Sequence, residues 1–214
     1  RESLNKHFQT KNLKGFGVED LTEGIIAAGS ILQYISEAQH KELGHISKIS
    51  RIEVDKYVWL DRFTTRNLEL INSPHENGAT LLSVLDKTIT PMGGRMMKRW
   101  MVLPLKELKI IESRLDAVNA LIKNEELAFE LSQRLGNIYD LERLASKIAV
   151  GKVNPKEVNQ LKNTLLELAP IQQLLKKTNS KALLSIADRM NPCEQLIDLI
   201  TKQLDDDPAV QIGK

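Results

Sequence analysis

Apolar residues recur at helical spacing along most of this chain. Over residues 21–35, leucine, isoleucine and alanine fall three or four positions apart, which predicts a helix that ends near Glu42. Asp20 and Glu23 stand three residues apart at its start, in the pattern of a capping box. Further stripes of this kind follow one another over residues 106–204, with short connections between them. The pattern therefore predicts a mainly α fold whose second half is an elongated bundle of antiparallel helices.

The helix start at Thr90 is unusual, because two glycines lie in its first turn. Thr90 can accept a hydrogen bond from a free N–H group of that turn, and Pro91 suits the first helical position, where no donor is needed. Gly93 and Gly94 are poor helix formers, so their presence indicates a backbone that packs closely against another segment. A broad stripe of methionines with Trp100 follows them. We therefore expect a structural hub on which the other helices dock, formed by Thr90, Pro91, Gly93, Gly94, Arg95 and Trp100.

Residues 51–60 are the part of the chain where the apolar period changes to two. Ile52, Val54, Val58 and Leu60 alternate with polar or aromatic residues, which is typical of a half-buried strand. A lone strand needs a partner, which must come from this chain or from outside it. The sequence thus predicts at most one or two short strands here, within a fold that is otherwise helical.

Composition narrows the function classes only slightly. The chain has 214 residues, of which 42% are hydrophobic, enough for a packed core, and its formal net charge of +2 favours no class of partner. Cys193 is the single cysteine, so neither an internal disulfide nor a zinc-finger spacing can form. The longest apolar run, residues 24–35, is shorter than a membrane span, and no signal peptide is visible. With one cysteine and no signal peptide, we expect a cytoplasmic protein. We also expect a piece of a longer polypeptide, since the chain begins at Arg1 without an initiator methionine.

No motif for catalysis or cofactor binding stands out. Residues 93–95 lack the G-x-x-x-x-G-K-[ST] spacing of a phosphate-binding loop, and the four histidines are too scattered to share a metal ion. Cys193 has no paired histidine to activate it. Asp140, Glu142, Arg143 and Lys147 lie close together in sequence, and pairs three positions apart such as Asp140 and Arg143 are typical of ion pairs on a helix surface. We therefore expect no catalytic residue, no metal site and no cofactor in this chain.

A basic cluster at Arg95, Lys98 and Arg99 is the sharpest candidate for a binding site. A DNA backbone would attract such side chains, and Lys98 and Arg99 are the residues that would make this contact. No aromatic residues interleave with them, as a single-strand binder would need. The favoured interpretation is structural, with Arg95 paired to a carboxylate such as Glu69 or Asp86.

A series of short motifs runs along the chain, beginning with Asp61, Arg66-Asn67-Leu68-Glu69-Leu70 and Thr90-Pro91-Met92-Gly93. Residues 61–105 look like the signature that opens the core of the MutS family of DNA mismatch repair proteins, and residues 140–155 resemble its next core segment. Residues 15–34 are similar to the end of the MutS connector domain. Met97 and Met101 depart mildly from the pattern, because leucine is more usual there. The matching residues include Asp61, Arg66-Asn67-Leu68-Glu69-Leu70, Thr90-Pro91-Met92-Gly93, Arg95, Trp100, Pro104-Leu105, Asp140-Leu141-Glu142-Arg143-Leu144, Gly151 and Pro155.

This resemblance implies a part of a larger protein. Residues 1–48 would be the C-terminal part of the connector domain, and residues 49–214 the first segment of the core and lever, before the clamp. The parent would be a DNA-dependent ATPase that binds ATP and magnesium in another domain. It would hold mismatched duplex DNA near the bacterial nucleoid, form a homodimer and meet a repair protein of the MutL type.

The role that the resemblance implies for this chain is mechanical. Its bundle would transmit the nucleotide state of the ATPase to the DNA-holding end, and a Gly93→Val change at the hub would uncouple ATP from DNA release. One alternative is a helical domain that binds duplex DNA directly through the basic cluster. Another is a docking module for a further repair protein, which would use residues 1–18 and the first long helix.

Overall fold

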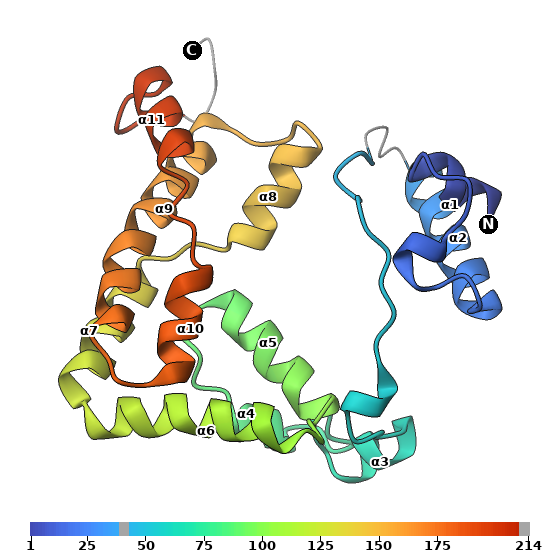
Figure 1. Cartoon of the computed structure of the whole chain (residues 1–214), viewed down its shortest axis with the longest axis horizontal. Coiled ribbons are helices and arrows are strands. Elements are labelled where there is room, and N and C mark those ends of the chain that lie inside the picture. Colours follow the sequence, from blue (N-terminus) through green and yellow to red (C-terminus); the bar gives the residue numbers. More distant parts are fainter. Residues whose placement is uncertain (39–42, 210–214) are drawn as a thin grey trace. The chain divides into compact units, whose positions relative to one another are not determined.

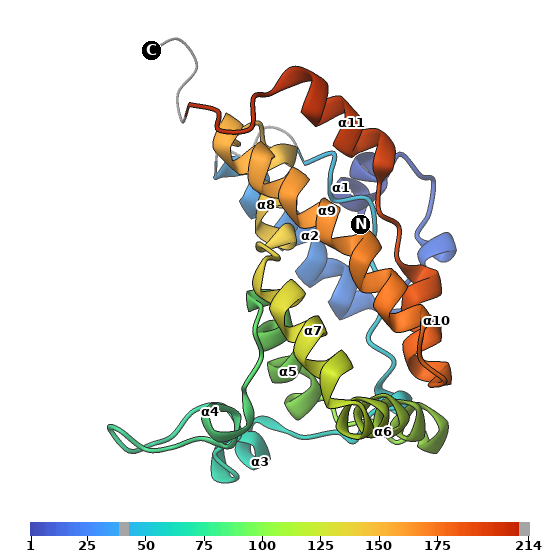
Figure 2. The same cartoon turned by 90° about the vertical axis from the view of Figure 1, so that its left-hand side faces the viewer.

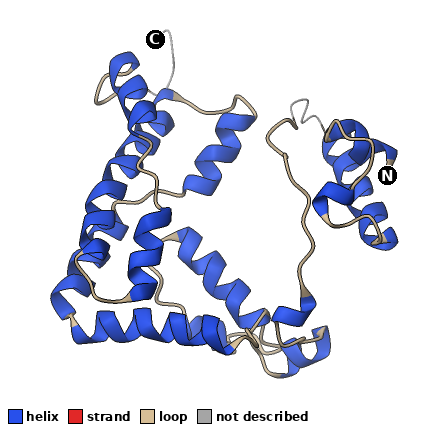
Figure 3. Ribbon diagram, in the orientation of Figure 1, coloured by secondary structure: helices blue, strands red, loops and turns tan. Residues whose placement is uncertain are grey.

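The computed structural model of the chain describes residues 1–38 and 43–209, and the regular structure of these residues is helical (Figures 1 and 3). The mainly α fold class predicted from the sequence is confirmed. Within the described residues, no helix has the length and apolar character that crossing a membrane requires. The elements are α1 (Glu2–His7), the 3-10 helix η1 (Lys14–Phe16), α2 (Thr22–Glu37), the 3-10 helix η2 (Val54–Lys56), α3 (Arg62–Asn67), α4 (Leu81–Leu85), α5 (Pro91–Val102), α6 (Leu108–Lys123), α7 (Glu125–Gly136), α8 (Leu141–Ala149), α9 (Pro155–Lys176), α10 (Lys181–Arg189) and α11 (Glu194–Gln203).

The chain divides into two compact units. The first consists of Arg1–Glu53 together with Arg143–Val153, and the second of Val54–Glu142 together with Asn154–Lys214. The division of the sequence into domains at residues 48 and 49 stays a prediction.

The first unit has a small apolar core around α1 and α2. Leu4 of α1 is buried together with Ile25 and Leu32 of α2. Leu13 and Val18, from the segment between the two helices, complete the buried cluster. Burying apolar side chains from both helices and their connection gives this part of the chain a core of its own.

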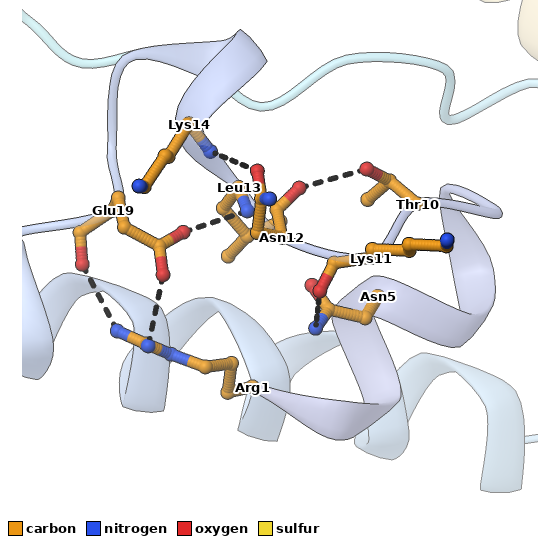
Figure 4. A network of polar contacts seen from close by, with 8 residues as sticks. All are labelled: Arg1, Asn5, Thr10, Lys11, Asn12, Leu13, Lys14 and Glu19. Carbon is orange, nitrogen blue, oxygen red and sulfur yellow. Dashed lines mark hydrogen bonds and ion pairs between the residues drawn. The ribbon is translucent and has the colours of Figure 1, made fainter.

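Glu19 holds the segment between α1 and α2 in place (Figure 4). Its carboxylate accepts a hydrogen bond from the backbone N–H of Leu13 at 2.7 Å. The guanidinium of Arg1 donates to the same carboxylate at 2.9 Å and to the backbone carbonyl of Glu19 at 2.9 Å. One acidic side chain thus joins the N-terminus of the chain to the loop that precedes α2.

The start of α2 differs from the sequence prediction. The expected capping box of Asp20 and Glu23 is wrong, because the residue at the N-cap is Leu21, which has no side-chain cap. The N–H of Leu21 bonds to the carbonyl of Val18 at 3.0 Å, so the chain turns just before the helix and moves its first residue along by one. The predicted helix end near Glu42 lies outside the described residues.

The core of the second unit is built along α9. This helix has 22 residues, which at the usual rise makes it about 33 Å long. It packs against α7, α10 and α11, and α10 also packs against α6. Figure 2 shows α10 and α11 following one another along α9. The buried residues at the centre of this core are Leu127, Leu131, Ile171, Leu175, Leu183 and Ala187.

A buried charge on α9 ties down the segment that follows α11. The side chain of Lys162 is only 5% exposed, and its ammonium group donates to Asp206 Oδ1 at 2.9 Å. The amide of Asn159, almost one turn earlier, donates to the backbone carbonyl of Asp206 at 2.6 Å. Because a buried ammonium without a partner is costly, these bonds determine where the chain leaves the bundle.

The strand predicted within residues 51–60 does not form. Residues 54–56 make the 3-10 helix η2, and Tyr57 forms an isolated antiparallel bridge with Leu105. The bridge has two backbone bonds, from the N–H of Val58 to the carbonyl of Pro104 at 2.7 Å and from the N–H of Lys106 to the carbonyl of Lys56 at 3.0 Å. On one side of it Pro104 has no N–H to donate back to Val58, and on the other side residues 54–56 are already in η2. The pairing therefore stops after one bridge, and the alternating sequence pattern was misleading.

Candidate functional site

The start of α5 has the local structure that the sequence predicts. Thr90 is the N-cap, and its hydroxyl oxygen accepts a hydrogen bond from the backbone N–H of Gly93 at 3.1 Å. Pro91 occupies the first helical position, where a backbone donor is not needed. This start requires only residues that are close in sequence, so it needs no distant partner.

Both glycines of α5 lie against the turn that precedes the helix. A Cβ atom built on Gly93 would come within 3.1 Å of Thr88 Cβ and of Thr90 Oγ1. A Cβ on Gly94 would lie 3.3 Å from Asp86 Oδ2 and from Thr88 Oγ1. The close backbone approach predicted for these positions is therefore confirmed, and the neighbour is the segment 86–90.

Asp86 shapes that turn through hydrogen bonds. Its Oδ1 accepts from the hydroxyl of Thr88 at 2.7 Å and from the backbone N–H of Thr88 at 3.0 Å. Both bonds favour the charged carboxylate and lower the pKa of Asp86, and the positive charge of Lys87 acts in the same direction. The carboxylate is thus occupied by its own turn.

Arg95 makes the most specific polar contact of α5. Its Nη1 and Nη2 donate to the two carboxylate oxygens of Asp140 at 2.9 and 2.7 Å, and its Nε donates to Glu142 Oε2 at 2.7 Å. The hydrogen bonds to Asp140, followed by that to Glu142, raise the pKa of Arg95. Planar, bidentate pairing of this kind fixes orientation as well as distance. Within the second unit, α5 is therefore joined to the segment where α8 begins.

The predicted pairing of Arg95 with a carboxylate is confirmed, but its expected partners are wrong. Glu69 accepts a hydrogen bond from Ser73 Oγ at 2.9 Å, and Asp86 is engaged by Thr88. The partners are instead Asp140 and Glu142, which the sequence had indicated as ordinary helix-surface charges. The available signal was their place at a helix start, because carboxylates favour that end of a helix.

The apolar stripe of α5 is largely uncovered in the described part of the chain. No residue of α5 is buried, and Trp100 is 41% exposed. The guanidinium of Arg114, on α6, lies over the Trp100 ring with its Cζ 3.5 Å from the ring centroid. Arg114 is a residue that the sequence analysis missed, since nothing in the spacing of the two residues indicates the contact. The helices of the second unit gather on α9, and the role of the α5 residues as a hub stays a prediction.

Lys98 and Arg99, both on α5, are exposed. Neither makes an ion pair or a side-chain hydrogen bond with residues 1–38 or 43–209. Their predicted contact with a DNA backbone stays a prediction. Among the residues described, no three histidine, cysteine or acidic side chains converge as a metal ion would need. The arrangement around α5 holds and orients charged groups; it brings together no nucleophile with a base.

Comparison with known proteins agrees with the order of motifs. The family model of MutS domain II matches residues 1–47, and that of MutS domain III matches residues 63–214. The DNA mismatch repair protein MutS of Cytophaga hutchinsonii is 53% identical over 204 residues, 95% of this chain and 24% of the relative. MutS of Christiangramia forsetii is 51% identical over 213 residues, and MutS of Bacteroides thetaiotaomicron is 49% identical over 214 residues.

These two matches cover the whole of this chain but 24% and 25% of the relatives' own lengths. The chain therefore spans about a quarter of the length of the proteins that it matches. Identity near one half along the entire chain, together with matches to two consecutive domains in the expected order, confirms the resemblance read from residues 61–105. The chain belongs to the MutS family of DNA mismatch repair proteins.

Proposed function

We propose that this chain is a non-catalytic core and lever segment of a MutS-type protein. In the parent it couples the state of an ATPase site to the binding of mismatched DNA, both of which lie outside these 214 residues. Packed helices suit this task, because a close-packed interior moves between discrete arrangements and does not deform smoothly. The bundle along α9 supplies such a body within the second unit.

The family membership supports a specific picture of the parent. Its relatives are named DNA mismatch repair proteins, so we propose that the parent binds mismatched duplex DNA in the bacterial cytoplasm. It would hydrolyse ATP with magnesium in a separate domain, act as a homodimer and pass its signal to a protein of the MutL type. None of these activities requires a catalytic residue in the present chain.

The observation that carries the coupling proposal is the contact of Arg95 with Asp140 and Glu142. Three hydrogen bonds join residues that are 45 and 47 positions apart in the sequence. A guanidinium held at two oxygens of one carboxylate resists rotation, so a displacement of α5 would be passed to the segment at the start of α8. A lysine at the same position would keep the charge but lose this fixed geometry.

An Arg95→Lys change in the full-length parent should therefore slow the ATP-triggered release of mismatched DNA by about tenfold, because coupling energies are typically 1–3 kcal/mol. Binding of ATP and of the mismatched duplex should each stay within about twofold of the unchanged protein. Release can be followed by stopped-flow fluorescence of a labelled mismatched duplex after ATP is added. Unchanged release would contradict the proposal.

The matched control for this experiment is Arg134→Lys. Arg134 donates to Glu167 at 3.0 Å, and its side chain is 41% exposed, against 49% for Arg95. This ion pair joins α7 to α9 inside the bundle, so its geometry should matter little for release. An equal slowing in both variants would show that any weakened ion pair has the effect, and would remove the specific role of Arg95.

A second candidate function is direct binding of duplex DNA, which the exposed and unpaired state of Lys98 and Arg99 in the described structure favours.

If the coupling proposal is correct, the 214-residue chain alone should bind duplex DNA no more tightly than about 10⁻⁴ M, the weak end of non-specific binding. Direct binding would instead give a plot of log affinity against log salt with a slope near −2, for two neutralised phosphates. A fluorescence anisotropy titration at several salt concentrations distinguishes the two, with Lys98→Ala as the variant that should flatten the slope.

A further inference from the structure

A hollow of about 610 Å³ lies beside α5 in the second unit. Its lining includes the apolar and aromatic side chains of Tyr57, Met92, Met96 and Trp100. Arg99 and Arg114 also line it, as do Arg95 and Glu142, which are already bonded to one another. Its volume is within the range of sites that enclose a small ligand or a few side chains.

Two arginines that line the hollow, Arg99 and Arg114, are not held by ion pairs in the described structure. Neither Arg99 nor Arg114 has a carboxylate partner in the described part of the chain. Burial lowers the pKa of Arg114, which means that its guanidinium is already partly removed from water. A cation in this state is stabilised by an anion that replaces the lost water.

The stacking of Arg114 on Trp100 prepares the guanidinium for such an anion. Its Cζ lies 3.5 Å from the ring centroid, so the guanidinium is in direct contact with the indole. Its N–H groups lie in the plane of the guanidinium, so its edge stays available to a carboxylate or a phosphate. The site is therefore oriented before any ligand arrives.

The apolar wall decides between these anions. A DNA duplex offers phosphates on an open polar surface and would leave the methionines and the Trp100 edge without a partner. A protein segment that carries an acidic residue next to a large apolar one would pair with the arginines and also pack against the apolar lining of the hollow. Methionine adapts well to an inserted side chain, because it is unbranched and polarisable.

We propose that this hollow, bounded by Arg99, Arg114 and Trp100, is the docking site for an acidic–apolar segment of the same parent polypeptide. In it, an aspartate or glutamate pairs with the two arginines, and the neighbouring apolar side chain packs on Trp100 and Met96. We place this segment in the same polypeptide because about three quarters of the relatives' sequence lies outside the part that this chain matches. This inference rests on family membership and on the hollow, and it stands whether or not the chain transmits an ATP signal.

The chemistry of the site can be tested on the 214-residue chain with a small probe. Trp59 and Trp100 give two indole N–H signals in an NMR spectrum, and only Trp100 lines the hollow. Adding N-acetyl-aspartyl-phenylalanine amide should shift the Trp100 signal in a saturable way and leave Trp59 in place. The asparaginyl analogue and acetate should each bind at least fivefold more weakly.

Arg99→Gln should weaken binding of the aspartyl probe by fivefold or more. Because Arg99 is exposed, this variant should fold normally. Arg114→Lys, which keeps the charge but loses the flat stacked group, serves as the second variant and should also weaken it. Equal binding of the aspartyl and asparaginyl probes would overturn the proposal. A shift of Trp100 by a short DNA duplex but not by the probe would assign the hollow to nucleic acid instead.

The source of the segment is tested by chemical protection. A cysteine placed by Met96→Cys, in a Cys193→Ser background, should react with a maleimide at least tenfold more slowly in the full-length parent than in the 214-residue chain. Arg99→Gln in the parent should restore part of the lost reactivity. Equal labelling of the two proteins, measured by mass spectrometry of the modified peptide, would mean that no segment of the parent occupies the hollow.

Discussion

Truncating Leu183 to alanine is expected to lower the free energy of unfolding of the second unit by about 3 kcal/mol. Leu183 is 4% exposed and belongs to the buried cluster formed by residues of α7, α9 and α10. Removing its side chain deletes apolar contacts and leaves a cavity that rigid neighbours fill only partly. Among single side-chain truncations in this bundle, this should be one of the most damaging, because Leu183 is almost fully buried and its helix packs against both α9 and α6.

The measurement is urea unfolding of the 214-residue chain followed by far-UV circular dichroism. Ile186→Ala is the matched control, since it removes a similar side chain from the same helix at a position that is 40% exposed. Its expected cost is below about 1 kcal/mol. If the two variants lost similar stability, the assignment of the core to the contact of α9 and α10 would be contradicted.

Replacing Gly93 by valine should be the second most damaging change, with a cost of about 2 kcal/mol in the same unfolding experiment. Even the first atom of the new side chain would lie 3.1 Å from both Thr88 Cβ and Thr90 Oγ1. The branched side chain must push the preceding turn away from α5 and so weaken the bond from the Gly93 N–H to Thr90. In the full-length parent we expect the same variant to release mismatched DNA normally without ATP and to lose the acceleration by ATP.

Gly136→Val provides the control for this change. Gly136 is the last residue of α7, and a Cβ atom there would have nothing within 4 Å. It should therefore cost well under half as much as the change at Gly93. A normal ATP response in the Gly93 variant would contradict the hub assignment, whereas equal damage by both variants would point to a general intolerance of valine at helical glycines.

Features that depend on neighbouring residues could be predicted from the sequence. The Thr90 cap, the place of Pro91 and the crowding at Gly93 each involve atoms no more than five positions apart. The order of motifs around residues 61–105 was sufficient for the family, because that comparison needs no contacts at all. The helical content followed from the apolar period along the chain.

Features that depend on distant partners could not be predicted. Arg95 was expected to bind a carboxylate, but the chain contains 28 acidic residues and the sequence cannot rank those that lie 45 positions away. The strand expected at residues 51–60 had the right alternation, yet the segment that it meets contains Pro104, which lacks the N–H that would extend the ladder. Arg114 reaches Trp100 only because α6 and α5 meet at that point.

By itself, therefore, the sequence determined that this protein is helical, where its sharpest helix start lies and to which family it belongs. Those properties arise from periodicity and from bonds between near neighbours, which do not depend on how distant parts of the chain pack. The tertiary structure alone decided which carboxylates bind Arg95 and along which helix the core of the second unit is built. It also decided that Arg99 and Arg114 line a hollow together with Trp100. Contacts of this kind are selected only when the whole chain packs, because many partners of equal chemistry compete for each side chain until then.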